Sequence, residues 1–130
     1  MPSFELAGPK PGFAPGDVVK VPFPYTDRAT RQRRPALIVS DASLQRRHGL
    51  LWLLMITSAE NRGWPGDVAI SNLAAAGLPA PSVIRTAKIA TIDACDAEPL
   101  GKIGARTQVA VMRHLAGILH SRLGLLTPAK

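Results

Sequence analysis

Apolar and β-branched residues recur in short blocks from residue 17 onward, and polar or proline-containing segments separate the blocks. This pattern predicts strands over residues 17–23, 35–40, 50–58, 67–70, 82–92 and 99–104. The block at 50–58 is apolar on both faces, which is typical of a central strand. Segments 24–33 and 41–49 lack an apolar period, so we expect loops there.

A helical pattern follows Thr107, a residue type that can cap a helix, near the end of the sequence. Apolar residues recur there at steps of three and four: Val111, Met112, Leu115, Ile118, Leu119 and Leu123. We therefore expect an amphipathic helix, with Arg113, His114, His120 and Arg122 largely off this stripe. One or two further helical turns are predicted over 71–77, closed by Gly77.

Five or six short strands with one terminal helix favour a compact, coiled β-barrel over a βαβ sheet. The predicted fold class is mainly β (α+β), a small coiled β-barrel with a C-terminal α-helix.

Residues 1–15, rich in proline and glycine, are expected to form a flexible tail before a domain at 16–124. Residues 125–130 are expected to form a second tail. We expect Trp52 in the core and Cys95 buried or half-buried.

Composition adds charge to this picture. The 130 residues include 16 Lys and Arg against 9 Asp and Glu, for a formal net charge of +7 and a pI near 10.5. A small domain this basic attracts polyanions, among them nucleic acid, anionic lipid and acidic proteins.

The apolar run at 50–56 is too short to span a bilayer, and the N-terminus does not resemble a signal peptide. With one cysteine, a cytoplasmic location is the expectation.

Motifs for metals and phosphate-binding loops are absent from the sequence. It contains no HExxH, no CxxC, no cluster of carboxylates and no GxxxxGK[ST] loop, so we expect neither a metal nor another cofactor. His48 lies in a polar segment and is expected at the surface. His114 and His120 are six residues apart on the predicted helix, which does not place them on one face.

Several segments, taken together, resemble MazF/PemK toxins of type II toxin–antitoxin systems. The strand and loop GDVVKVPFPYTD at 16–27, followed by RRPALIVS at 33–40, are similar to the opening of that family. Later landmarks are matched by MITS at 55–58, PSVIR at 81–85 and KIATID at 88–93. The likeness keeps the family's order and spacing over roughly residues 16–122.

The resemblance implies an SH3-like β-barrel that forms a homodimer. It also implies a metal-independent, sequence-selective endoribonuclease that cuts single-stranded RNA and is neutralised by a cognate antitoxin protein. An acidic, partly disordered antitoxin segment could cross the basic surface and fold as it binds.

The resemblance also points to two catalytic candidates. Metal-free cleavage uses the ribose 2′-hydroxyl as the nucleophile, so the enzyme must align that group and stabilise the charge of the phosphorane. Arg34 suits the second task, because its planar guanidinium can hold two phosphate oxygens and stays cationic. Thr57 matches the family's active-site threonine or serine and would position the reacting groups. The simpler alternatives are a solvated arginine within 28–34 and a structural threonine at a strand end.

The remaining candidates would bind RNA without cutting it: Tyr25, Arg28, Arg31, Arg33, Ser58, Arg62 and Trp64. Arginines would contact phosphates, with Arg46 and Arg47 extending the track, while the aromatic rings would stack on bases. Trp64 could equally cover the open end of the barrel.

Two other functions stay open. One is a toxin-fold protein that acts by contact, as in a sister group that poisons DNA gyrase. The other is a basic SH3-like module that binds nucleic acid without turnover. Neither would need Arg34 and Thr57 in catalytic roles.

Overall fold

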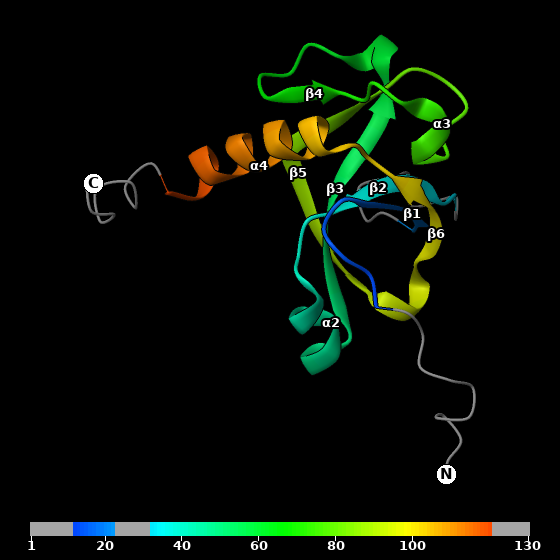
Figure 1. Ribbon diagram of the computed structural model, residues 1–130, viewed down its shortest axis with the longest axis vertical. Helices are drawn as coiled ribbons and strands as arrows, with labels where there is room; N and C mark the ends of the chain where they lie inside the picture. The colour runs from blue at the N-terminus through cyan, green and yellow to red at the C-terminus, as the bar shows by residue number, and fades with distance from the viewer. Residues whose placement is uncertain (1–11, 23–31, 121–130) are drawn as a thin grey trace.

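The computed structural model describes residues 12–22 and 32–120 of the chain (Figure 1). The strands are β1 (Asp17–Val21), β2 (Arg34–Ile38), β3 (Leu50–Ser58), β4 (Asp67–Ala69), β5 (Ser82–Asp93) and β6 (Glu98–Lys102). The α-helices are α2 (Ala42–His48), α3 (Leu73–Ala76) and α4 (Ala105–His120). Two short 3₁₀ turns, η1 (Ala59–Asn61) and η2 (Ala94–Asp96), follow β3 and β5. None of these helices is long and apolar enough to cross a membrane.

The six strands form one antiparallel sheet in the order β4-β5-β3-β2-β1-β6. The register shifts between Leu54 and Met55 of β3, where β5 contributes extra residues, and again between Val18 and Val19 of β1. Such irregularities bend and twist a sheet. The coiled, mainly β fold with a C-terminal helix is therefore confirmed, but β4 and β6 remain separate edges in the described residues, so the barrel is not closed.

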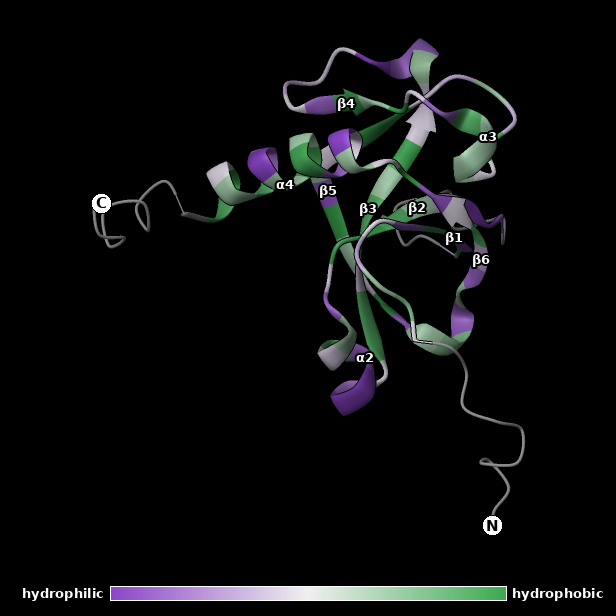
Figure 2. Ribbon diagram, viewed as in Figure 1, coloured by the Kyte–Doolittle hydropathy of each residue, from purple (hydrophilic) through white to green (hydrophobic). Residues whose placement is uncertain are grey.

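Alternation along the strands builds two apolar clusters on opposite faces of the sheet. Val18 belongs to one cluster and its neighbour Val19 to the other. The first cluster also receives Val111 and Leu115 from α4, which lies across the sheet (Figures 1 and 2). Both clusters contain residues from β3, which lies inside the sheet as predicted.

The strand predictions agree with the structure to within about two residues, but the loop predicted at 41–49 is wrong. This segment contains α2, which Asp41 caps by accepting a 2.7 Å hydrogen bond from the Ser43 amide. None of the residues of α2 is buried, so no apolar period marks it. The C-terminal helix begins at Ala105, before the predicted cap, and Thr107 is buried within its first turn.

Predictions of burial fail on one surface of the molecule. Trp52 is 45% exposed, although we expected it in the core. The apolar stripe of α4 is also only partly covered: Met112, Ile118 and Leu119 are exposed. A stripe of apolar residues predicts that a surface is covered, but it does not tell whether the same chain or another molecule covers it. Cys95 is likewise exposed, because it lies in the short turn η2.

Candidate functional site

Arg34 and Thr57 meet in one pocket at the end of β3. In the antiparallel register Ala36 of β2 lies opposite Met55 of β3, so two further residues along each strand bring Arg34 level with Thr57. The pocket has a volume of about 340 Å³. Its lining comprises Lys20, Arg34, Pro35, Ile56, Thr57, Ser58, Leu100 and residues 77–82.

The pocket is cationic and carries hydroxyl groups. Arg34 is half-buried at the start of β2, and the described part of the chain provides its guanidinium with no hydrogen bond or ion pair. Lys20, an exposed residue of β1, lines the same pocket, although it was not among the residues expected to bind RNA. No carboxylate is among the described lining residues. An anion such as a phosphodiester would therefore meet positive charge without local repulsion.

The hydroxyl of Thr57 is held in place from one side. Thr57 is 7% exposed, and its Oγ1 accepts a 3.0 Å hydrogen bond from Nδ2 of Asn61. Ser58 caps the η1 turn, since its Oγ accepts from the amide of Glu60 at 3.2 Å. The sequence contained no signal for Asn61, because this contact depends on how η1 folds back over β3.

Arg33 does not line the pocket, although it precedes Arg34 in the sequence. Its guanidinium donates hydrogen bonds to the carbonyls of Asp96 and Lys20 and lies 3.7 Å from the carboxylate of Glu98. These contacts link β2 to the β6 side of the sheet. The hydrogen bonds of Arg33 therefore direct its guanidinium toward β1 and η2, whereas Arg34 lines the pocket.

Two further RNA-binding candidates, Arg62 and Trp64, lie in the loop between η1 and β4. Arg62 donates a 3.0 Å hydrogen bond to the carbonyl of Ala59 and so closes the η1 turn. Trp64 is 43% exposed, and its ring stacks at 4.2 Å over the guanidinium carbon of Arg85. The ring also lies 5.5 Å from Nζ of Lys88. Neither Arg62 nor Trp64 is among the pocket lining residues.

Beneath Trp64 lies a buried ion pair that was not predicted from the sequence. Arg85 donates to both carboxylate oxygens of Asp67, at 3.1 and 2.9 Å, and the two side chains are only 7% and 8% exposed. The hydrogen bonds from Arg85 lower the pKa of Asp67 below its ordinary value. Arg85 also donates a 2.7 Å hydrogen bond to the carbonyl of Asn61. The pair thus ties β4 and β5 to the turn that contacts Thr57.

The other RNA-binding candidates, Tyr25, Arg28 and Arg31, lie outside the described residues. Among the described residues, no group of three or more histidines, cysteines and carboxylates is arranged to hold a metal ion. His48 and His114 are exposed.

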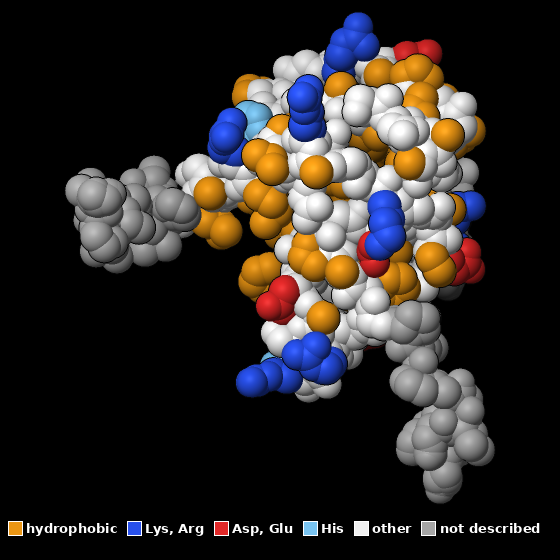
Figure 3. All heavy atoms as spheres, in the orientation of Figure 1, with side chains coloured by type: hydrophobic (Ala, Val, Ile, Leu, Met, Phe, Trp, Pro, Cys, Tyr) orange, Lys and Arg blue, Asp and Glu red, His pale blue; other side chains and the backbone are white. Residues whose placement is uncertain are grey.

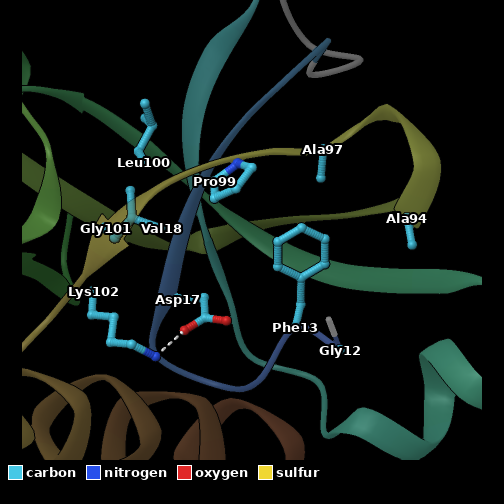
Figure 4. Close-up of a pocket in the computed structure, with 10 residues that line it drawn as sticks. All are labelled: Gly12, Phe13, Asp17, Val18, Ala94, Ala97, Pro99, Leu100, Gly101 and Lys102. Atoms are coloured by element: carbon cyan, nitrogen blue, oxygen red, sulfur yellow. Dashed lines mark hydrogen bonds and ion pairs between the residues drawn. The ribbon is translucent and has the colours of Figure 1, made fainter. Parts of the chain in front are cut away.

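Two larger hollows lie elsewhere and are mainly apolar. One, of about 640 Å³, is lined by Phe13 and by residues of β1 and β6, and its charged groups Asp17 and Lys102 already form a 2.9 Å ion pair (Figure 4). The other, here called the α4 groove, has a volume of about 710 Å³. It is lined by residues 39–41, Leu44, Trp52, Thr86, Ala87, Ile89, Met112, Leu115, Ala116, Ile118 and Leu119. Figure 3 shows hydrophobic side chains gathered along α4 and toward α2.

Comparisons with known proteins identify a family and solved structures that this chain resembles. The family described as PemK-like, MazF-like toxin of type II toxin-antitoxin system matches residues 14–119. MazF from Deinococcus radiodurans is 25% identical, with a TM-score of 0.68 over 85% of this chain and 98% of that one. The MazE–MazF complex from the same organism is 24% identical, with the same TM-score and coverage. No curated protein matches the chain.

A third solved structure is an endoribonuclease in complex with its cognate antitoxin from mycobacterial species. It is 20% identical to this chain, with a TM-score of 0.64 over 85% of this chain and 95% of that one. At this level of identity the similarity establishes a shared fold.

Proposed function

The chain belongs to the family of PemK-like, MazF-like toxins of type II toxin–antitoxin systems, and from this membership we propose that it is an endoribonuclease that cuts single-stranded RNA without a metal ion. The observation that carries the proposal is the meeting of Arg34 and Thr57 in one cationic pocket. Arg34 keeps its guanidinium free of described protein partners, as a group that must bind a phosphate would.

The pocket residues suit cleavage through the ribose 2′-hydroxyl. The 2′ oxygen forms a bond to phosphorus while the bond from phosphorus to the 5′ oxygen breaks. The products are a 2′,3′-cyclic phosphate and a 5′-hydroxyl, after the 2′ oxygen loses a proton and the 5′ oxygen gains one. Arg34 and Lys20 would stabilise the negative charge of the phosphorane, and Thr57 would donate to a phosphoryl oxygen. The described lining holds no carboxylate or imidazole, so charge stabilisation and alignment are its contributions.

We also propose that cleavage depends on RNA sequence. One wall of the pocket is the apolar segment Leu78–Pro79–Ala80–Pro81, which lies beside Thr57. A wall of this kind accepts a nucleobase by shape and apolar contact and so discriminates among the bases next to the cleaved bond.

The α4 groove supports a homodimer. Trp52, Ile89, Met112, Ile118 and Leu119 are between 39% and 69% exposed and line this groove together. A soluble monomer rarely exposes so many large apolar side chains side by side, and a symmetric contact between two copies would cover them.

A cognate antitoxin is the second proposed partner. Relatives with this fold have been solved with antitoxins, MazE among them. An acidic segment of such a protein would complement the net charge of +7 and occupy the pocket that the RNA phosphate needs. We propose a cytoplasmic location for this activity, where mRNA would be available as the substrate.

The test is incubation of a long single-stranded RNA with antitoxin-free protein in EDTA. Wild type should produce discrete fragments. Arg34→Ala should cut at least about a hundredfold more slowly, as expected when a transition-state charge partner is lost. Arg106→Ala is the matched control, because Arg106 is exposed on α4, does not line the pocket and is not among the arginines expected to contact RNA. Intact RNA with folded wild type would favour a protein that acts by contact, and inhibition by EDTA would exclude the metal-free mechanism.

A further inference from the structure

The hydroxyl of Thr57 has a partner that the proposed mechanism does not use. Nδ2 of Asn61 donates to Thr57 Oγ1 over 3.0 Å, at the buried edge of the pocket. We propose that Asn61 is a positioning residue, which directs the O–H bond of Thr57 toward the scissile phosphate. This inference rests on the nuclease function proposed above.

The direction of the O–H bond of Thr57 follows from the number of hydrogen bonds that a hydroxyl group can donate and accept. Threonine has one O–H donor and two lone pairs on its oxygen. The amide of Asn61 donates into one of these lone pairs, so the O–H bond of Thr57 is left to point at another acceptor. Thr57 lines the pocket, so the acceptor available there would be a phosphoryl oxygen of bound RNA. Accepting a hydrogen bond also polarises the hydroxyl and makes it a stronger donor.

The backbone of Asn61 is itself held in place by Arg85 of β5. It ends the three-residue turn η1, and its backbone carbonyl accepts a 2.7 Å hydrogen bond from Arg85. Arg85 is in turn held by both carboxylate oxygens of Asp67 and covered by the ring of Trp64. A continuous series of contacts therefore runs from the buried ion pair through Asn61 to Thr57.

The neighbouring loop is anchored to the same strand. Thr86, which follows Arg85 in β5, donates a 2.9 Å hydrogen bond from its hydroxyl to the carbonyl of Gly66. Gly66 has a φ of +87°, and a Cβ there would lie 2.7 Å from Thr86 Oγ1. The loop from η1 to β4 is thus held at both of its ends, which fixes where Asn61 can place its amide.

Asn61 differs from the members of the ion pair in being exposed. Its replacement leaves the apolar clusters and the Asp67–Arg85 contact in place, because Arg85 binds the backbone carbonyl and not the amide side chain. The residue can therefore be altered while the fold is kept, which separates a positioning role from a structural one.

The experiment is single-turnover cleavage of a single-stranded RNA in EDTA, with the dissociation constant for RNA measured in parallel. Asn61→Ala should lower the cleavage rate about tenfold, since the hydroxyl loses its orientation. Its dissociation constant should stay within about twofold of wild type, because the groups that bind phosphate are unchanged. Glu60→Gln is the matched control, because Glu60 is an exposed residue of the same turn whose side chain makes no hydrogen bond to Thr57, and it should cut at the wild-type rate.

Two further variants test whether Asn61 acts through Thr57. In a Thr57→Val background, Asn61→Ala should cause no additional loss, because no hydroxyl remains to be oriented. Asn61→Asp places a carboxylate that can only accept, so it would turn the O–H bond of Thr57 away from the pocket. The rate of this variant relative to wild type should be lowest near neutral pH and should rise as the pH is lowered and the new carboxyl becomes protonated.

Each outcome has a distinct meaning. A wild-type rate for Asn61→Ala, or an equal loss in both Thr57 backgrounds, would overturn the positioning role and leave the nuclease intact. A constant ratio of the Asn61→Asp and wild-type rates across pH would also overturn it, independently of any residual activity of Thr57→Val. Wild-type protein that cuts no RNA would overturn the proposed function and this inference with it.

Discussion

Two hollows along β3 differ in chemistry and in how their walls are held. The pocket at Thr57 presents two cations and three hydroxyls, and its buried threonine is fixed by Asn61. The α4 groove beside Trp52 presents large apolar side chains, several of them exposed. The first is organised within one chain, whereas the second leaves apolar surface for another molecule to cover. We infer that the pocket at the end of β3 serves RNA cleavage and that the α4 groove serves dimer formation.

The largest effect should come from removing the charge of the pocket while the groove is kept. Arg34→Ala should lower the cleavage rate by about 10²–10³-fold and leave the molar mass in solution unchanged. Arg34→Lys should retain part of the activity, because the charge remains but the paired hydrogen bonds of the guanidinium are lost. Cleavage kinetics and light scattering on the same samples measure both effects. Equal activity of Ala and Lys variants would contradict a role for charge.

The converse change places a charge in the groove and spares the pocket. Met112→Asp should weaken self-association by at least about a hundredfold, since a carboxylate would be desolvated in the apolar contact. Val109→Asp is the matched control, because Val109 is 54% exposed on the same helix and does not line the groove. Sedimentation over a range of concentrations gives both dissociation constants. Unchanged self-association of Met112→Asp would remove the groove from the proposed interface.

A smaller effect is expected from the buried ion pair that supports the pocket. Arg85→Met should lower the free energy of unfolding by about 3 kcal/mol, because the carboxylate of Asp67 would remain buried without a partner. Lys102→Met is the comparison, since its ion pair with Asp17 involves a lysine side chain that is 75% exposed. That variant should change stability by less than about 1 kcal/mol. Urea unfolding monitored by fluorescence measures both, and equal losses would contradict the special status of Arg85.

The smallest expected effect is a dependence of stability on acid. Arg85 lowers the pKa of Asp67 in the folded protein from the ordinary 3.8, so folding favours the carboxylate. The stabilisation is fully present above the unfolded pKa and is lost as the pH falls through the lower, folded value. Wild type should therefore lose more stability than Asp67→Asn when the pH is lowered below about 4. Parallel pH profiles of the two proteins would contradict this linkage.

The strands could be predicted because each carries apolar residues between polar or proline-containing segments, and β3 agrees with its predicted range residue by residue. The helix α2 could not, because none of its residues is buried. Trp52 and Met112 show a second limit: an apolar residue indicates a covered surface, but the cover can be another molecule.

The candidate site shows a third limit, which concerns side-chain direction. The family resemblance singled out Arg34 and Thr57, and the register of β2 and β3 brings them together. Sequence could not show that the side chain of Arg33 turns away from the pocket, since two of its partners, Asp96 and Glu98, lie more than 60 residues away. Asn61 was missed for a similar reason, because its role depends on a turn that Arg85 anchors.

The most direct test of the central claim uses RNA with a single 2′-deoxynucleotide at a mapped cleavage site, incubated in EDTA. A site that depends on the ribose 2′-hydroxyl should cut the unmodified RNA to a 2′,3′-cyclic phosphate and a 5′-hydroxyl, and should leave the modified position intact. Equal cleavage of both RNAs, or products that carry a 5′-phosphate, would contradict the account.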